Sequence, residues 1–198
     1  MIIAATHAQL KRDHNLLLSN KTTSESLQNG FTLIELVIVI VILAVLASTA
    51  FAKFNNLATE ARIATVHAMQ GAMSSTASLV QMKLNIENVK DGFITLNGNP
   101  IAVNDGYITG HWNNAWRYAL DVGQEITFTK IADECTVNEI CGVGNQRTAD
   151  GIPISTNGSK GLVLIWLKGM KLEDLCYAFY YNPNNGDAPT TGSVTTGC

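Results

Sequence analysis

The stretch NGFTLIELVIVIVILAVLAS, Asn29–Ser48, contains one ionisable residue, Glu35, in an otherwise largely apolar run. As a helix, the roughly 22 residues from Phe31 to Ala52 would extend about 33 Å, which is enough to cross the hydrocarbon core of a bilayer. Secretory signal peptides have shorter apolar regions of about 7 to 15 residues. The length therefore favours a retained transmembrane helix over residues 31–52.

Glu35 needs an explanation, because a charged side chain inside a membrane helix costs on the order of 3 kcal/mol on insertion scales. One interpretation is that its carboxylate reaches the headgroups from near the end of the helix. The other follows from cleavage between Gly30 and Phe31, which would create a free amine nearby in the sequence. An amine and a carboxylate neutralise one another in apolar surroundings better than either is tolerated alone. Glu35 is therefore interpreted as half of a pair.

Composition narrows the class of protein. The chain has 198 residues, of which 46% are hydrophobic and 15% charged, and its formal net charge is -3. This length suits one domain with an appendage. The mildly negative net charge gives no sign of the basic stripe that phosphate backbones need, so a nucleic-acid partner is not expected. The four cysteines are an even number in a region that follows an apolar anchor, which indicates disulfides formed outside the cytoplasm. Their connectivity is left open by the spacing alone.

A helical period continues beyond the anchor as two stripes, the second of which widens the face expected to be buried. The first stripe is Phe54, Leu57, Ala61, Ala64, Ala68, Gly71, Ala72, Ser75, Leu79 and Met82, and the second is Ile63, Val66, Met73, Ala77 and Val80. Both are expected to pack on a globular head, as one helix from Phe31 to near Leu84 with residues 53–84 as its amphipathic part.

The head, residues 85–198, is expected to be rich in antiparallel strands. Apolar and β-branched runs predict strands at residues 125–131, 162–167 and 175–181. Turn signals predict loops at residues 87–107 and 182–197. Residues 110–120 are interpreted as a loop leading into a short helix or strand, and the glycine cluster after Cys141 as a loop.

The run Gly30-Phe31-Thr32-Leu33-Ile34-Glu35 before an unbroken apolar stretch resembles the processing motif of type IV prepilins and type II secretion pseudopilins. The resemblance implies the α+β type IV pilin fold and a leader over residues 1–30. It also implies that a membrane prepilin peptidase cleaves after Gly30 and methylates the amine of Phe31. Glu35 would then meet the Phe31 amine of an adjacent subunit in a filament core.

A second run, KFNNLATEAR over residues 53–62, resembles the mannose-sensitive haemagglutinin pilins, although Ala52 stands where those pilins usually have proline. A weaker kink is therefore expected there. Type IV pilins typically have a carboxy-terminal loop closed by a disulfide, which implies a bridge between Cys176 and Cys198. Cys135 and Cys141 would then form a small local bridge.

Catalytic and metal-binding motifs are not apparent in the sequence, so we expect no enzyme, no cofactor and no metal. The four histidines lack metal-ligand spacing. Residues 182–187 have oxygen ligands for calcium, but a plain turn is preferred. Trp166 is expected in the core, whereas Trp112 and Trp116 are left open between the core and a sugar-binding or partner surface.

The expected function is that of a structural subunit of a bacterial type IV pilus, held in the inner membrane and then assembled into an extracellular adhesive fibre. Its expected partners are related subunits, the prepilin peptidase, the inner-membrane assembly machinery and a candidate host or surface receptor. Rival hypotheses are a type II secretion pseudopilin, a soluble secreted binding domain cut after Ala52, and a membrane-tethered enzyme. Thirty residues make a long leader for such a subunit, so initiation closer to Gly30 is a further expectation.

Intact-mass analysis of the purified protein should show a chain that begins at Phe31 with one added methyl group. Cleavage at the small-x-small site Ala50-Phe51-Ala52 would instead give a chain that begins at Lys53. That second mass would contradict the retained helix and the pairing role of Glu35.

Overall fold

The structure is a computed structural model that describes residues 30–198. The chain divides into two compact units, Met1–Val45 and Leu46–Cys198. The boundary between these units falls within the first helix. Apart from Gly30, the expected leader lies outside the described residues.

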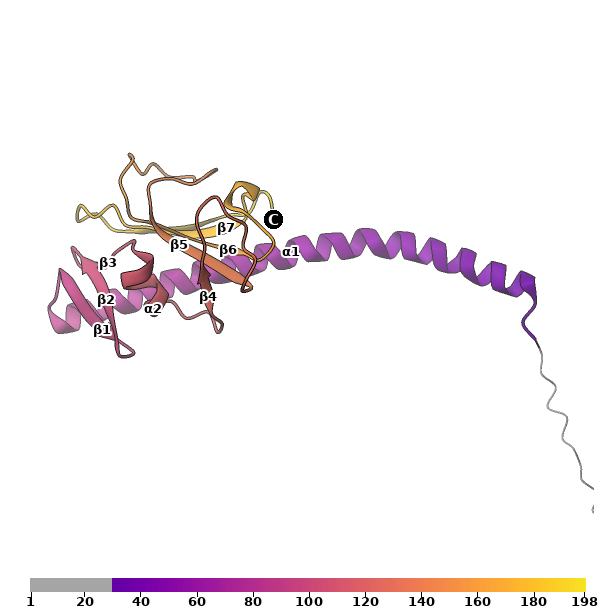
Figure 1. Cartoon of the computed structure of the whole chain (residues 1–198), viewed down its shortest axis with the longest axis horizontal. Helices are drawn as coiled ribbons and strands as arrows, with labels where there is room; N and C mark the ends of the chain where they lie inside the picture. Colours follow the sequence, from indigo (N-terminus) through magenta and orange to yellow (C-terminus); the bar gives the residue numbers. More distant parts are fainter. Residues whose placement is uncertain (1–29) are drawn as a thin grey trace, which may run out of the picture. The chain divides into compact units, whose positions relative to one another are not determined.

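One long helix is followed by two β-sheets (Figure 1). The elements are α1 Leu33–Glu87, β1 Gly92–Leu96, β2 Asn99–Asn104, β3 Tyr107–Ile108, η1 Trp112–Trp116, α2 Arg117–Ala119, β4 Ile126–Phe128, β5 Ile140–Gln146, β6 Leu162–Leu167, η2 Leu172–Asp174, β7 Tyr177–Tyr181 and β8 Thr190–Val194. The sheet orders are β1-β2-β3 and β4-β5-β6-β7-β8. This α+β arrangement is the expected one and is consistent with a type IV pilin fold. Pairing is antiparallel except between β4 and β5, which are parallel, contrary to prediction.

Within residues 46–198, α1 packs on the head with one face only. Val66, Met69, Met73, Val80 and Leu84 are at most 2% exposed, and their spacings of three, four, seven and four residues place them on one face of the helix. Most of these positions belong to, or extend, the predicted second stripe, which is confirmed as a core face. The prediction that the first stripe packs on the head was wrong.

The first stripe lies mainly on the solvent side of α1. Phe54 is 70% exposed, Leu57 60%, Leu79 56% and Met82 54%, and most of its small residues are exposed too. Only Ala72 is half-buried. Period alone shows that a helix has apolar faces, but it does not show which of them meets the sheet. The face with larger Val, Met and Leu side chains is the one that fills the core.

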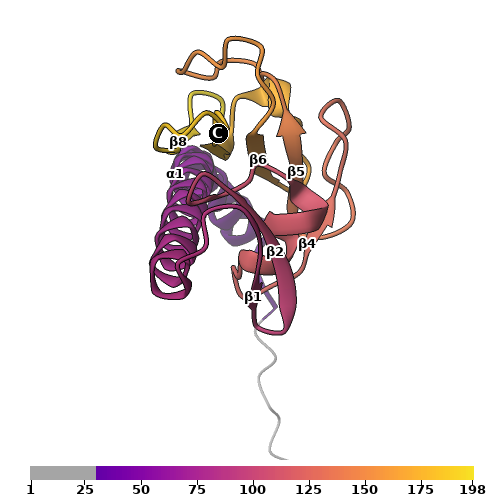
Figure 2. The same cartoon turned by 90° about the vertical axis from the view of Figure 1, so that its left-hand side faces the viewer.

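Both faces of the five-stranded sheet are covered. On one face Ser193 contacts His67 of α1, with 3.2 Å between the Ser193 Oγ and His67 Nδ1 atoms, and Figure 2 shows β8 beside α1. On the other, the hydroxyl groups of Tyr177 and Tyr181 donate to the carbonyls of Asp150 and Thr156, in the segment between β5 and β6. Because both faces of the sheet are covered, the sequences of β6 and β7 are continuously apolar and do not alternate between apolar and polar residues.

The strand β5 was predicted to be a loop because of its glycines, and that prediction was wrong. A Cβ atom on Gly142 would lie 2.1 Å from the ring of Trp112, and one on Gly144 would lie 2.5 Å from the backbone nitrogen of Trp112. Glycine in a strand often marks such a close approach. The two glycines therefore make room for η1 against β5.

The predicted loop at residues 87–107 contains the β1–β2 hairpin. Its turn places Asn97 and Gly98 at φ 50° and 81°, and Asn-Gly is the residue pair that such tight hairpin turns favour. The predicted loop at residues 182–197 contains β8, where Gly192 leaves space for the ring of Phe179. In both places the turn signals were read correctly, but the short strands beside them were missed.

The remaining predicted elements agree more closely with the structure. The strand β6 has the predicted bounds, β7 begins at Tyr177, and β4 covers only Ile126–Phe128 of the predicted strand. Residues 110–120 form η1 and α2, so the helical alternative holds. The helix α1 is uninterrupted through Ala52, as expected where proline is absent.

Two tyrosines of β7 are buried in their neutral form. Burial raises the pKa of Tyr177 to about 12, and the negative charge of Asp150 adds to the effect. Burial also raises the pKa of Tyr180, whose hydroxyl donates to the carbonyl of Ile108 at 2.6 Å. These phenols therefore stabilise the fold only while they are protonated.

Replacing one residue of each stripe should identify the core face. Met73→Ala should lower the free energy of unfolding by about 2 to 5 kcal/mol, because Met73 is fully buried. Leu79→Ala, the matched change on the exposed face, should change it by less than about 0.5 kcal/mol. Urea unfolding of the full chain in detergent micelles, followed by tryptophan fluorescence, measures both. Equal losses would contradict the assignment of faces.

Stability should fall as pH rises from 10 to 12. Unfolded tyrosine loses its proton near pH 10, whereas folded Tyr177 keeps it up to a pKa of about 12. The unfolded state then binds fewer protons, so each unit of pH removes up to about 1.4 kcal/mol for this group. Tyr177→Phe should flatten the decline, at a cost of about 1 kcal/mol at neutral pH for the lost hydrogen bond. An unchanged slope in this variant would refute the assignment.

Candidate functional site

The candidate site is the start of α1, where Thr32 is the N-cap residue. Its hydroxyl oxygen accepts a hydrogen bond from the backbone N–H of Glu35 at 3.2 Å, and its carbonyl accepts one from the N–H of Leu36 at 3.2 Å. Thr-x-x-Glu is the capping-box pattern, and it places the acidic side chain near the positive end of the helix dipole. Sequence reasoning missed this signal, although the pattern is readable in the sequence.

The carboxylate of Glu35 makes no hydrogen bond or ion pair with another of the residues 30–198, where the recorded ion pairs all involve other acidic side chains. Its flanking residues Ile34 and Leu36 are apolar and are 68% and 60% exposed. Glu35 is thus an unpaired acid on an apolar surface. Within the described residues the fold supplies no cation to pair with it.

Gly30 and Phe31 precede the helix. Phe31 is 84% exposed, and a Cβ atom built on Gly30 would have no neighbour within 4 Å. The described fold therefore does not itself require glycine at this position. The peptide bond between the two residues lies in an exposed segment immediately before the N-cap.

The large apolar residues of α1 on both sides of Glu35 are exposed, with values from 43% at Val37 to 80% at Leu33. Among the described residues, α1 is the one helix long and apolar enough to cross a membrane. Its polar groups include Thr49, whose hydroxyl donates to the carbonyl of Leu46 at 2.9 Å. Such internal bonding suits a helix in hydrocarbon, where no water is available.

Further along, in the unit Leu46–Cys198, the exposed first stripe forms a surface that we call the outer stripe: Leu57, Ala61, Ala64, Ala68, Gly71, Ser75, Leu79 and Met82. Its middle residues, from Ala61 to Ser75, are all small. Small side chains allow the backbones of two helices to approach closely. This surface can therefore accept another helix without rearrangement of the head.

Comparison with known protein families finds a match at the start of α1. A family model described as the prokaryotic N-terminal methylation motif matches residues 26–51. The chain carries the amino-terminal signal of type IV pilins and pseudopilins. No curated protein matches the chain, and neither does any solved structure.

Two disulfides lie far from the prepilin signal in sequence and tie down the head. Cys176 is bonded to Cys198 and Cys135 to Cys141, with Cα–Cα distances of 4.8 and 5.6 Å. These are the pairs that the resemblance implies. The first closes the carboxy-terminal segment back to the start of β7.

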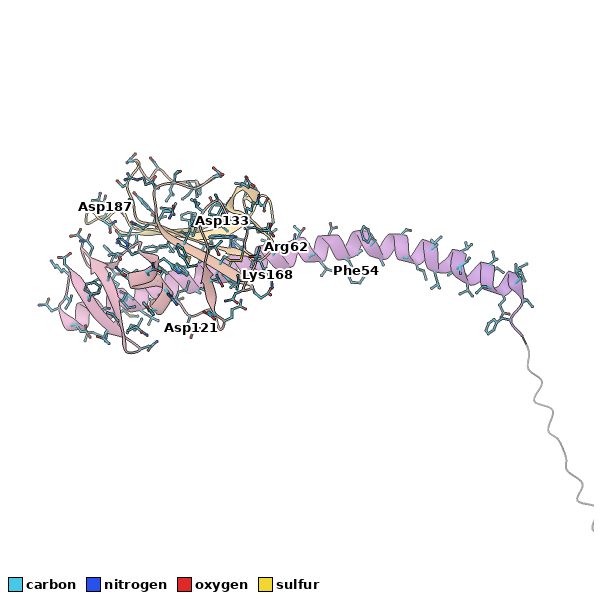
Figure 3. All side chains as sticks on the ribbon, viewed as in Figure 1. Phe54, Arg62, Asp121, Asp133, Lys168 and Asp187 are labelled. Carbon is cyan, nitrogen blue, oxygen red and sulfur yellow. A yellow bond between two sulfur atoms is a disulfide. The ribbon has the colours of Figure 1, made fainter. Side chains whose placement is uncertain are left out.

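The carboxy-terminal segment also contacts α1. The guanidinium of Arg62 donates to the carbonyl of Cys198 at 3.3 Å, and the N–H of Gly197 donates to the carbonyl of Leu175 at 3.2 Å. Figure 3 labels Arg62 where α1 meets the head. The disulfide loop and the helix are thereby held together within the same unit.

The other candidate residues do not converge on a chemical site. Trp112 and Trp116 are at most 3% exposed and belong to the core with Trp166, so the interpretation that they line a ligand surface was wrong. The indole N–H of Trp116 donates to the carbonyl of Thr109 at 3.0 Å. Within residues 30–198 there is no group of three His, Cys, Asp or Glu residues that could hold a metal ion.

The segment at residues 182–187 is a turn held by its own side chains. The Oδ1 atom of Asn182 accepts from the N–H of Asn184 at 2.8 Å, and the side chain of Asn185 donates to the carboxylate of Asp187 at 2.7 Å. Two of the oxygens considered as calcium ligands are therefore engaged within the turn. This agrees with the preferred interpretation as a plain turn.

Proposed function

We propose that the protein is a structural, non-enzymatic subunit of a bacterial type IV pilus, most like the mannose-sensitive haemagglutinin class. In this proposal it polymerises through its amino-terminal helix into a surface fibre used for adhesion. The observation that carries the proposal is the unpaired carboxylate of Glu35 on an exposed apolar helix, immediately behind a methylation-motif cleavage point.

Processing at Gly30 would supply the missing cation. No neighbouring atom in the described fold requires glycine at position 30. The glycine is explained instead by a peptidase that must approach the peptide bond between Gly30 and Phe31. Cleavage leaves an amine on Phe31, one helical turn from Glu35. Pairing of that amine with the Glu35 carboxylate of an adjacent subunit satisfies both charges inside an apolar core.

The rest of the helix supports the same packing. The outer stripe continues the exposed apolar surface into the part of α1 that bears the head. Adjacent subunits would therefore pack helix on helix over more than the apolar anchor. Before assembly the anchor would lie in the inner membrane, and afterwards the fibre would be extracellular.

Pseudopilins of type II secretion systems share the amino-terminal signal and are the nearest alternative. They generally lack a terminal disulfide loop, whereas Cys176 and Cys198 close one here. The finer assignment to the mannose-sensitive haemagglutinin class is supported by the resemblance of residues 53–62. The disulfide loop therefore favours a pilus over a secretion pseudopilus.

Glu35→Val should leave membrane insertion intact and abolish or scramble fibre growth. The buried amine would lose its partner, which costs about 3 to 5 kcal/mol per contact, while a valine is easier to insert than a glutamate. Glu60→Val, a matched change at an exposed position of α1, should still give fibres. Electron microscopy of sheared fibres and membrane fractionation measure the two outcomes. Normal fibres from the Glu35→Val variant would refute the pairing.

A further inference from the structure

We propose that strand β1 of the head pairs edge to edge with β1 of a second copy of the chain, in antiparallel register about Ile94. The site is the free edge of β1, by which we mean the side of the strand that faces away from β2. Because β1 ends the strand order β1-β2-β3 (Figure 1), this side has no neighbouring strand among the described residues. The edge lies within the unit Leu46–Cys198. Pairing there therefore requires neither processing at Gly30 nor packing of the apolar anchor.

The backbone groups of Phe93 and Thr95 point away from β2. Successive residues of an antiparallel strand form hydrogen bonds alternately to one side and to the other. Thr95 lies opposite Pro100 of β2, and proline has no N–H, so this pair cannot exchange both hydrogen bonds. Ala102, the residue opposite Phe93, uses its carbonyl on the other side of β2, where it accepts from the N–H of Thr109. The free edge of β1 therefore presents the N–H and C=O groups of Phe93 and Thr95.

The side chains of the same two residues form an uncharged surface. Phe93 is 63% exposed and Thr95 is exposed on the same face of the strand, whereas Ile94 is buried on the opposite face. The sequence of β1, GFITL, contains no charged residue and no proline. The acid that precedes it, Asp91, is engaged elsewhere, because its carboxylate accepts from the N–H of Asp105 at 2.9 Å. Charges and prolines are the residues that commonly prevent an edge strand from pairing with another chain.

The other edge strands of the two sheets are protected in ways that β1 is not. The strand β3 has two residues, and the carbonyl of Ile108 accepts from the hydroxyl of Tyr180 at 2.6 Å and the amide of Asn182 at 3.0 Å. The strand β4 has three residues. The strand β8 lies beside α1 (Figure 2), where Ser193 contacts His67. Short or covered edges resist pairing, so β1 is the edge that stays open in residues 30–198.

The strand β1 is complementary to itself. A twofold axis at Ile94 puts Phe93 of one copy opposite Thr95 of the other, and the symmetry forms this pair twice. Each such pair can exchange two backbone hydrogen bonds. An aromatic ring opposite a β-branched residue is also a favourable cross-strand pair. A second copy of β1 therefore meets both the hydrogen-bonding groups and the exposed ring of the free edge.

The charges beside β1 permit this register. It would place Lys90 and Asp91 next to Gly98 and Asn97 of the second copy, so no like charges would lie opposite each other. A twofold contact uses the same surface on both copies and is closed. It therefore joins heads in pairs and does not by itself extend a fibre. One short strand from each copy gives a small interface, of the size class that forms weak, transient complexes.

The first test measures association of the full chain in detergent micelles, by sedimentation velocity at rising protein concentration and with micelles in large excess. Wild type should form dimers as its concentration rises. Thr95→Pro removes an outward N–H from each copy and should weaken association about tenfold or more, because two hydrogen bonds are lost. Proline is tolerated on an edge strand where the N–H faces solvent, so the melting followed by circular dichroism should be unchanged.

A charge variant tests the same edge without altering the backbone. Thr95→Lys should also weaken association, because a lysine on an edge strand opposes pairing. Thr136→Lys adds the same charge at an exposed position in the loop between Cys135 and Cys141. This matched control should associate as wild type does.

Introduced cysteines test the register, because the native cysteines are all paired. A mixture of Phe93→Cys and Thr95→Cys chains should form a disulfide between unlike chains on mild oxidation. Residues opposite each other in such a pair have Cα atoms about 5.5 Å apart, which suits a disulfide. Either variant alone should cross-link more slowly, because two copies of one position would lie on a longer diagonal.

A wild type that stays monomeric at every concentration would overturn the proposal, and is the result expected if β1 pairs with an extended segment of a different protein. Equal association of wild type, Thr95→Pro and Thr95→Lys would also overturn it, because the dimer would then use another surface. Faster cross-linking of Phe93→Cys with itself than with Thr95→Cys would overturn the antiparallel register. Glu35→Val should still pair its heads, and Thr95→Lys should still grow fibres. Failure of the β1 pairing is therefore distinguishable from failure of the proposed assembly.

Discussion

The proposed assembly depends on one unfavourable arrangement, a carboxylate held on an apolar surface without a partner among residues 30–198. Glu35 stands in the first turn of α1, where capping by Thr32 and the helix dipole offer it modest local stabilisation. Neither is sufficient for a charge that enters hydrocarbon, which calls for an opposite charge or water. In the proposed assembly, the amine that processing creates on Phe31 of an adjacent subunit would resolve the conflict.

The helix serves two purposes because it has two apolar faces. Val66, Met73 and Val80 belong to the core that holds the sheet. The outer stripe is left free, and its small side chains keep that surface open to a close neighbour. A head that covered the whole helix would hide this surface. The division between the faces therefore lets one element build the domain and still expose a surface of small side chains, which in the proposed fibre would contact another subunit.

Local sequence rules predicted α1 and its methylation motif, because length, apolar period and the run around Glu35 are properties of neighbouring residues. They did not predict which face of α1 is buried, since that depends on where the sheet lies. Gly142 and Gly144 were misread for the same reason: their purpose is set by Trp112, which lies about 30 residues away. The strands β1 and β2 were missed because Asn97-Gly98 was read as a loop and not as a hairpin turn.

The most direct test of the pairing is the position of the two charges in an assembled fibre. Cryo-electron microscopy of the fibre at side-chain resolution would locate the amino-terminal nitrogen of Phe31 and the carboxylate of Glu35. We expect these groups from adjacent subunits to lie within about 4 Å of each other. A map in which Glu35 instead meets a lysine or arginine of a neighbouring head, or faces solvent, would contradict the pairing.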